Sequence, residues 1–130
     1  MVLFNPALLP KFFVAQLLQF IYGDAPRLHN VWLIQTPSFR SAAVILGKAS
    51  LYIGAEGGLH HAAAAVGTPA TILFGGWLPP SVLGYEAHAN LTGGATEACG
   101  LLRPCDHCAA AMDRITVDEV LAAAETKLRR

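Results

Sequence analysis

Residues 50–76 constrain the fold of this chain more than any other stretch. Two short apolar runs, 51–53 and 70–74, are each closed by glycine, as buried parallel strands often are. Four consecutive alanines at 62–65 predict a helix between them, and Gly67 ends it. The order strand, helix, strand predicts two parallel strands joined by a right-handed crossover.

The loop before this helix predicts a site for an anion. Gly57 and Gly58 can adopt backbone angles that are closed to other residues, so we expect both in a tight turn. A crossover of this kind places the loop at the carboxyl end of the first strand, where the unpaired amides of the helix start face outward. Such a helix end can hold a phosphate group.

The residues around the loop resemble the carboxy-terminal half of glycosyltransferase family 9, the ADP-heptose heptosyltransferases of lipopolysaccharide synthesis. From residue 54 the chain has Gly-x-Glu-Gly-Gly-x-x-His-x-Ala-Ala-Ala-x-Gly-x-Pro-x-x-x-Leu-Phe-Gly. The usual family form is Asp-Ser-Gly-x-x-His, an alanine-rich helix, Gly-x-Pro and a strand ending in Phe-Gly. Glu56 and Gly57 replace the aspartate and serine, whereas Gly58 and His61 match.

This resemblance, which runs from about residue 31 to the end, implies a fold and a reaction. The fold is α/β, with a Rossmann-like parallel sheet and helices on both faces, as in half of a GT-B fold. Residues 31–130 would form an incomplete donor-binding domain. The reaction is transfer of a heptose-like sugar from a nucleotide-diphosphate sugar to lipopolysaccharide or another glycan, and it requires no cofactor.

The resemblance also implies the site and the partners. Backbone amides would hold the diphosphate, His61 would donate to it, and Glu56 would bond a sugar hydroxyl. The residues so assigned are Glu56, Gly57, Gly58, Leu59, His61, Gly76 and Trp77. In the family the acceptor site and general base lie in a separate amino-terminal domain, so an acceptor domain or partner chain is implied. We identify no catalytic residue in this chain.

Two interpretations of Trp77 and two of the whole chain remain open. Trp77 follows the second strand in Gly75-Gly76-Trp77-Leu78-Pro79-Pro80, which predicts an irregular loop. Its indole could stack on a base or sugar, or cover the edge of the core. The chain itself could be a non-catalytic nucleotide-binding or interaction module, or a truncated inactive fragment.

Other segments predict the rest of the α/β fold. We expect a strand at 31–35, a helix at 39–49 and a last strand at 88–92. Thr36-Pro37-Ser38 predicts the helix start, with a capping hydroxyl and an early proline. A final helix follows Thr116, with Glu119 at the capping-box position.

Residues 1–30 predict a separate helical segment. The run 12–22 lies between Pro10 and Gly23 and is apolar nearly all round. It is shorter than the about 20 residues that cross a bilayer. A packed helix and an interfacial membrane anchor both fit this pattern.

Composition limits the partners. The formal net charge is +0, so no overall field attracts nucleic acid, which we exclude as a partner. The chain is 54% hydrophobic and 14% charged, against about 25% charged for typical domains. Either some apolar surface meets another domain, chain or membrane, or the domain is small and tightly packed.

Cys99, Cys105 and Cys108 form the remaining cluster. Their spacing, Cys-x5-Cys-x2-Cys, suits zinc, and His107 or His88 could add a fourth ligand. A structural staple and reduced buried thiols are the alternatives. Free thiols favour a reducing compartment, so we expect the protein in the cytoplasm, with a peripheral position at the inner membrane as the alternative.

His60 is expected to be an ordinary core or surface histidine. Glu56, His60 and His61 do not converge as in the His-Glu-x-x-His motif, because consecutive helical residues point about 100° apart. The sequence also lacks the Gly-x-Ser-x-Gly elbow, the Walker phosphate loop and the dinucleotide fingerprint, which argues against a hydrolase or dehydrogenase.

Overall fold

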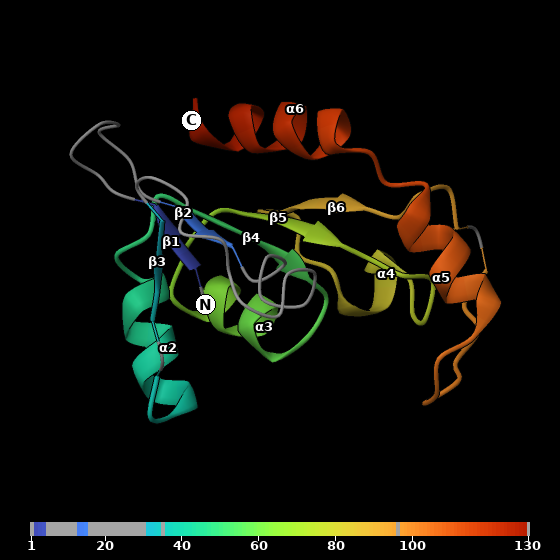
Figure 1. The fold of residues 1–130 in the computed structure, drawn as a ribbon, viewed down its shortest axis with the longest axis horizontal. Helices are drawn as coiled ribbons and strands as arrows, with labels where there is room; N and C mark the ends of the chain where they lie inside the picture. The colour runs from blue at the N-terminus through green and yellow to red at the C-terminus, as the bar shows by residue number, and fades with distance from the viewer. Residues whose placement is uncertain (1, 5–12, 16–30, 35, 96, 130) are drawn as a thin grey trace.

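The computed structural model describes residues 2–4, 13–15, 31–34, 36–95 and 97–129. Within them the strands form one sheet in the order β3-β1-β2-β4-β5-β6 (Figure 1). The strands are β1 Val2–Phe4, β2 Phe13–Ala15, β3 Val31–Leu33, β4 Leu51–Ala55, β5 Ala70–Leu73 and β6 Ala89–Leu91.

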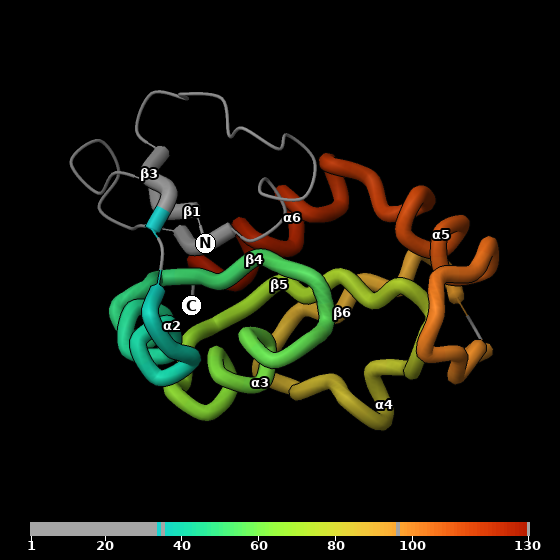
Figure 2. The backbone as a smooth tube through the Cα atoms, turned by 60° about the horizontal axis from the view of Figure 1, so that its bottom comes forward, coloured from blue at the N-terminus to red at the C-terminus, as the bar shows by residue number. Residues whose placement is uncertain are grey.

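Helices lie on both faces of this sheet. They are α2 Phe39–Leu46, α3 Gly58–Ala65, α4 Pro80–Leu83, α5 Asp106–Asp113 and α6 Val117–Leu128. Figure 1 shows α6 along one face and α2 and α3 on the other, and Figure 2 shows α4 on the same side as α3. None of the described helices is long and apolar enough to cross a membrane.

The α/β expectation is confirmed by the parallel part of the sheet. β4 pairs in parallel with β5, with Tyr52 opposite Ala70, and β5 pairs in parallel with β6. β2 is also parallel to β4. α3 connects β4 to β5, as residues 50–76 predicted, because the two apolar runs are buried and the alanines favour a helix.

Two expectations, a wholly parallel sheet and a helix at 12–22, are wrong in the amino-terminal part of the chain. β1 is antiparallel to both β2 and β3, so the sheet is mixed instead of wholly parallel. Residues 13–15 form β2, which contradicts a helix at 12–22 over these three positions. A short apolar run fits a buried strand as well as a helix. Residues 12 and 16–22 of that predicted helix lie outside the described residues.

The carboxy-terminal half differs from the expectation mainly by two extra helices. The irregular loop ends at Pro79, since Pro80 begins α4 in the first-turn position that suits proline. α5 was not predicted. The capping box of α6 is confirmed: the Glu119 carboxylate accepts from the Thr116 amide at 2.8 Å, and the Thr116 hydroxyl accepts from the Glu119 amide at 3.3 Å.

The main core lies between the sheet and the α2–α3 layer. Its buried members are Leu46, Tyr52, Ala62, Ala63, Ala70, Ile72 and Phe74. Alanines on both α3 and β5 let the helix backbone approach the strands closely. The Thr68 hydroxyl donates to the Leu46 carbonyl at 2.7 Å and so ties the end of α3 to the end of α2.

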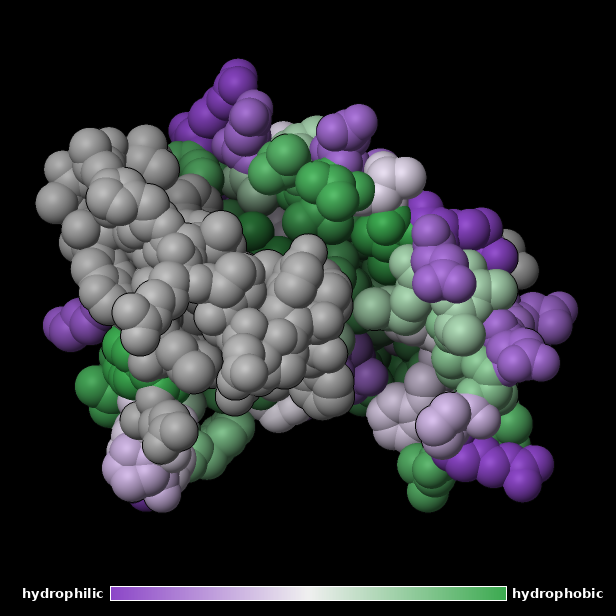
Figure 3. Space-filling model, viewed as in Figure 1, coloured by the Kyte–Doolittle hydropathy of each residue, from purple (hydrophilic) through white to green (hydrophobic). Residues whose placement is uncertain are grey.

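The opposite face is covered by α6, which contacts β4, β5 and β6. Ala124 is buried against the sheet, whereas Val117 and Leu121 are 74% and 54% exposed. Figure 3 shows apolar side chains at the surface among the charged groups of α6. Some apolar surface is therefore exposed, as the composition allowed.

Gly54 offers a test of this packing. A methyl group there would collide with the Tyr52 ring, which is fully buried. We expect Gly54→Ala to lower the free energy of unfolding by about 1 to 3 kcal/mol, the usual range for overpacking. Gly47→Ala is the matched control, because its added carbon meets only ordinary contacts of 3.6 Å or more. Equal stability of the two variants in urea denaturation would contradict this packing.

Candidate functional site

The predicted anion loop lies at the carboxyl end of β4, beside β5. The Glu56 amide donates to the Leu73 carbonyl at 3.0 Å, so pairing with β5 continues to the last residue before the loop. Glu56 itself is half-buried. α3 then begins at Gly58, and its N-cap residue, Gly57, makes no side-chain cap hydrogen bond. The amides of its first turn therefore have no side-chain acceptor from the cap.

The two glycines of the loop have different roles. Gly57 has φ 153° and ψ −167°, which L side chains rarely adopt, and no atom of the described residues lies within 4 Å of where its Cβ would be. Gly58, in contrast, has no positive φ and is the first helical residue. The expectation of unusual angles is thus confirmed for Gly57 and wrong for Gly58. A Cβ on Gly58 would lie 3.4 Å from the Phe39 ring.

Leu59 and His61 follow on the first turn of α3. Leu59 packs against the core, so it can offer only its backbone amide to a ligand. His61 is half-buried, and its Nδ1 lies 3.0 Å from the Tyr85 hydroxyl. This contact fixes the imidazole against the chain that crosses from β5 to β6.

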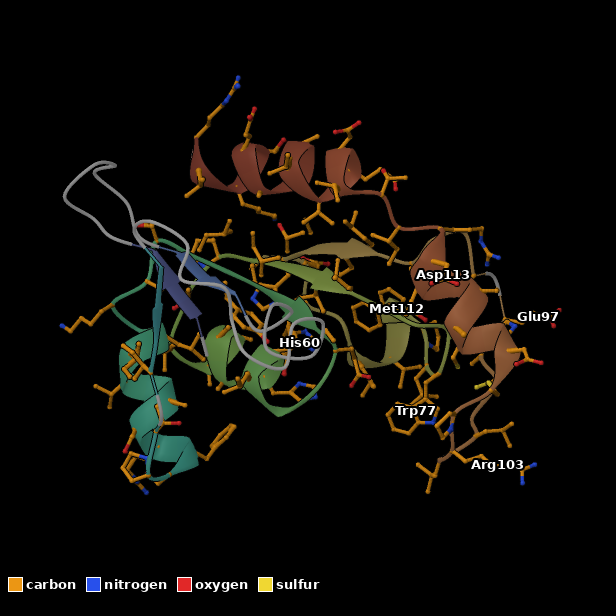
Figure 4. All side chains as sticks on the ribbon, in the orientation of Figure 1. His60, Trp77, Glu97, Arg103, Met112 and Asp113 are labelled. Carbon is orange, nitrogen blue, oxygen red and sulfur yellow. The ribbon has the colours of Figure 1, made fainter. Side chains whose placement is uncertain are left out.

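The structure does not bring Trp77 to this loop. The Gly76 carbonyl accepts from the Cys99 amide at 3.0 Å, and the Trp77 carbonyl accepts from the Gly100 amide at 3.1 Å. Figure 4 shows Trp77 on the α5 side of the molecule, with Arg103, and away from His60. The Trp77 indole nitrogen is buried without a hydrogen-bond partner in the described structure. The structure thus keeps Trp77 away from the predicted anion loop, and the choice between its two interpretations stays open.

His60 is fully buried behind the loop, in a cluster that the sequence did not reveal. Its ring lies 4.7 Å from that of His61, 5.2 Å from Tyr85 and 5.4 Å from His88, measured between centroids. Neither of its nitrogens has a partner among the described residues. Tyr85 and His88 reach α3 from over 20 residues away, and no local pattern predicts such a contact.

Burial is the main cause of the pKa shifts of His60 and His88. Desolvation lowers the pKa of His60 to about 4, and nearby His61 and His88 act in the same direction. Burial also lowers the pKa of His88, as does the Lys127 ammonium, while the Thr68 backbone opposes the shift. At neutral pH the His60 ring is therefore uncharged. Beside His88 and Tyr85 is a cavity of about 180 Å³ that reaches Thr68 and Pro69.

The three cysteines are brought together, as their spacing predicted. Their sulfur atoms all lie within 4.8 Å of one another, so the cluster could hold a metal ion. Cys105 is the N-cap of α5 and Cys108 is in its first turn, while Cys99 comes from the preceding loop. All three are half-buried free thiols.

Neither suggested histidine completes this cluster. His107 Nε2 lies 3.0 Å from the Glu97 carbonyl oxygen, and His88 belongs to the His60 cluster. The thiols also differ from one another. The pKa of Cys105 is lowered, chiefly by the backbone amide of Cys108, whereas a hydrogen bond with Cys99 raises the pKa of Cys108 to about 12.

The buried His60 predicts a pH dependence of stability. Between pH 6.5 and about 4 the unfolded chain binds a proton that the folded ring does not, so stability is fully present above pH 6.5 and is lost as pH falls towards 4. We expect His60→Leu to flatten this loss and to raise stability at low pH. His61→Leu is the control. Urea denaturation across this pH range checks it, and an unchanged slope in His60→Leu would contradict the assignment.

No protein-family model, curated protein or solved structure matches this chain. The family resemblance therefore rests on the residues quoted above.

Proposed function

We propose that this chain is the donor-binding part of a glycosyltransferase resembling family 9, with a Rossmann-like sheet equivalent to half of a GT-B fold. The observation that carries the proposal is the turn at Gly57. It directs the uncapped amino end of α3 outward at the carboxyl end of β4, where open α/β sheets bind ligands.

The diphosphate of a nucleotide sugar suits this turn. The amides of Gly58 and Leu59 lie in the first helical turn, where the helix dipole favours negative charge. His61 adds a side chain one turn on, and its Nδ1 contact with Tyr85 leaves Nε2 to donate to a phosphate oxygen. Stabilising the departing diphosphate in this way is the electrostatic half of sugar transfer.

Glu56 is suited to the sugar and not to the phosphate. It precedes the turn, and a carboxylate beside a diphosphate would repel it. A carboxylate can instead accept hydrogen bonds from the hydroxyls of a heptose-like sugar. In this proposal Gly76 and Trp77 do not touch the donor directly, because their loop is hydrogen-bonded to residues 99–100.

The acceptor would be supplied outside these residues. Sugar transfer requires the donor and acceptor to be held in line, and no general base is identified in the described site. We therefore propose a separate acceptor domain or partner chain, and a lipopolysaccharide or other glycan as acceptor. We also propose that the protein works in the cytoplasm, with a peripheral position at the inner membrane as the alternative, because its proposed acceptor is a lipid-linked glycan.

A second proposal concerns the cysteines: they hold a structural zinc ion. Thiolates are preferred zinc ligands, and the three sulfurs, from one loop and one helix start, lie close enough together to offer three of the four ligands of a structural zinc site. The ion would attach residues 97–105 to α5. Because the Cys99 and Gly100 amides donate hydrogen bonds to the Gly76 and Trp77 carbonyls, the ion would also hold the Gly76–Trp77 loop in place.

Calorimetric titration of variants tests the donor site. We expect nucleoside diphosphates to bind more tightly than monophosphates. Gly58→Val should weaken diphosphate binding sharply, because a branched side chain would crowd the Phe39 ring, 3.4 Å from the Cβ position, and disturb the first turn of α3, whereas the control Gly47→Val should bind as wild type. His61→Ala should lose about 1 to 3 kcal/mol, which is about 5- to 150-fold in Kd.

Glu56→Ala separates sugar from phosphate. It should leave the nucleoside diphosphate bound and weaken only the nucleotide sugar. Equal weakening of both ligands, or normal binding by Gly58→Val, would show that the donor site is assigned wrongly.

Metal analysis tests the zinc proposal. Purified protein should carry about one zinc per chain and melt at a lower temperature after chelation, since metal binding free energy is folding free energy. Cys108→Ser should lose the metal. His107→Ala should keep it, because this ring is turned to the Glu97 carbonyl. Metal-free protein with a chelator-independent melting temperature would refute a zinc site.

A further inference from the structure

The two sulfur–sulfur distances from Cys99 in the cysteine cluster are unequal. Cys99 Sγ lies 3.7 Å from Cys105 Sγ but only 3.1 Å from Cys108 Sγ. A tetrahedral zinc ion with bonds of about 2.3 Å holds its sulfurs about 3.8 Å apart. The Cys99–Cys105 distance matches that spacing. The Cys99–Cys108 distance is shorter than this zinc spacing but longer than the S–S bond of a disulfide, which is about 2.05 Å.

The backbone holds Cys99 and Cys108 in this approach. The Cys99 amide donates to the Gly76 carbonyl, and the adjacent Gly100, with φ 63°, turns the chain away. Cys108 is held by α5, whose Ala109 amide donates to the Cys105 carbonyl at 3.0 Å. Both sulfurs are therefore carried by hydrogen-bonded segments.

The cluster is also open to small oxidants. Residues 100–104, between the first two cysteines, are all exposed, and Leu102 is 91% exposed. Figure 4 shows this segment, with Arg103, at the outer end of the molecule. A peroxide can reach the half-buried thiols from that side.

We propose that Cys99 and Cys108 form an oxidative cross-link: a peroxide joins them in a disulfide and leaves Cys105 as a free thiol. One sulfur attacks a peroxide oxygen, the O–O bond breaks, and a sulfenic acid and one water form. The second thiol displaces the hydroxyl from that sulfenic acid, which forms the S–S bond and releases a second water. Two thiols and one hydrogen peroxide thus give one disulfide and two waters.

The cross-link removes two of the three metal ligands. Disulfide sulfurs are no longer thiolates, so a bound zinc ion would be released. This consequence rests on the zinc proposal, whereas the cross-link itself does not.

Oxidation of metal-free protein tests the cross-link directly. The chain is treated with hydrogen peroxide, alkylated, digested and analysed by mass spectrometry. We expect alkylation to fall from three thiols to one, with residues 99 and 108 in one linked peptide and the alkyl group on Cys105. Cys105→Ser should form the same cross-link, and circular dichroism confirms that it is folded.

A second arm uses the zinc-loaded protein. Peroxide should lower the zinc content from about one per chain to near zero, and thiol reductant should restore it. Absence of zinc before oxidation would refute the zinc proposal and leave the cross-link standing. A disulfide to Cys105, three alkylated thiols after peroxide, or overoxidation without a disulfide would overturn the cross-link.

Discussion

The close approach of α3 to β4 and β5 is the constraint on which the rest of the structure depends. Small residues make this approach: Ala62 and Ala63 on the helix and Ala70 on the strand are buried, and Gly54 leaves room for the Tyr52 ring. The helix lies close on the sheet, and only Glu56 and Gly57 separate the end of β4 from its first turn, so the chain must turn sharply there. The positive φ of Gly57 makes that sharp entry possible. The direction of the free amides at the helix start is thus a result of core packing.

The same packing creates a buried polar cluster behind the proposed site. His60 shares the first turn of α3 with the outward amides, yet its ring is fully buried against Phe74 and Tyr85. Two unpaired ring nitrogens in a core are destabilising, since a buried polar atom without a partner loses its hydration. The adjacent His61 contacts the Tyr85 hydroxyl. Tyr85 therefore contacts both the fully buried His60 ring and the half-buried His61 ring.

The features that could be predicted from the sequence are those set by residues close together in the chain. The β4–α3–β5 unit and the capping box at Thr116 were predicted because local composition determines them. The antiparallel β1 was not, since a three-residue apolar run shows neither that it forms a strand nor in which direction it pairs. Cys105 was recognised as a ligand candidate. Its position as the N-cap of α5 was missed because the spacing of the cysteines was interpreted only as a metal-ligand pattern. The contacts of His60 with Tyr85 and His88 join distant segments, so they required the structure.

The most direct test of the donor site is a nuclear magnetic resonance titration of the labelled protein with a nucleoside diphosphate. We expect the amide resonances of Gly57, Gly58, Leu59 and His61 to shift most, because these amides form the turn and first helical turn that would contact the diphosphate. The matching nucleoside, without phosphate, should leave them nearly unchanged. Shifts confined to other parts of the chain, or no shift at saturating ligand, would contradict a phosphate site at the start of α3.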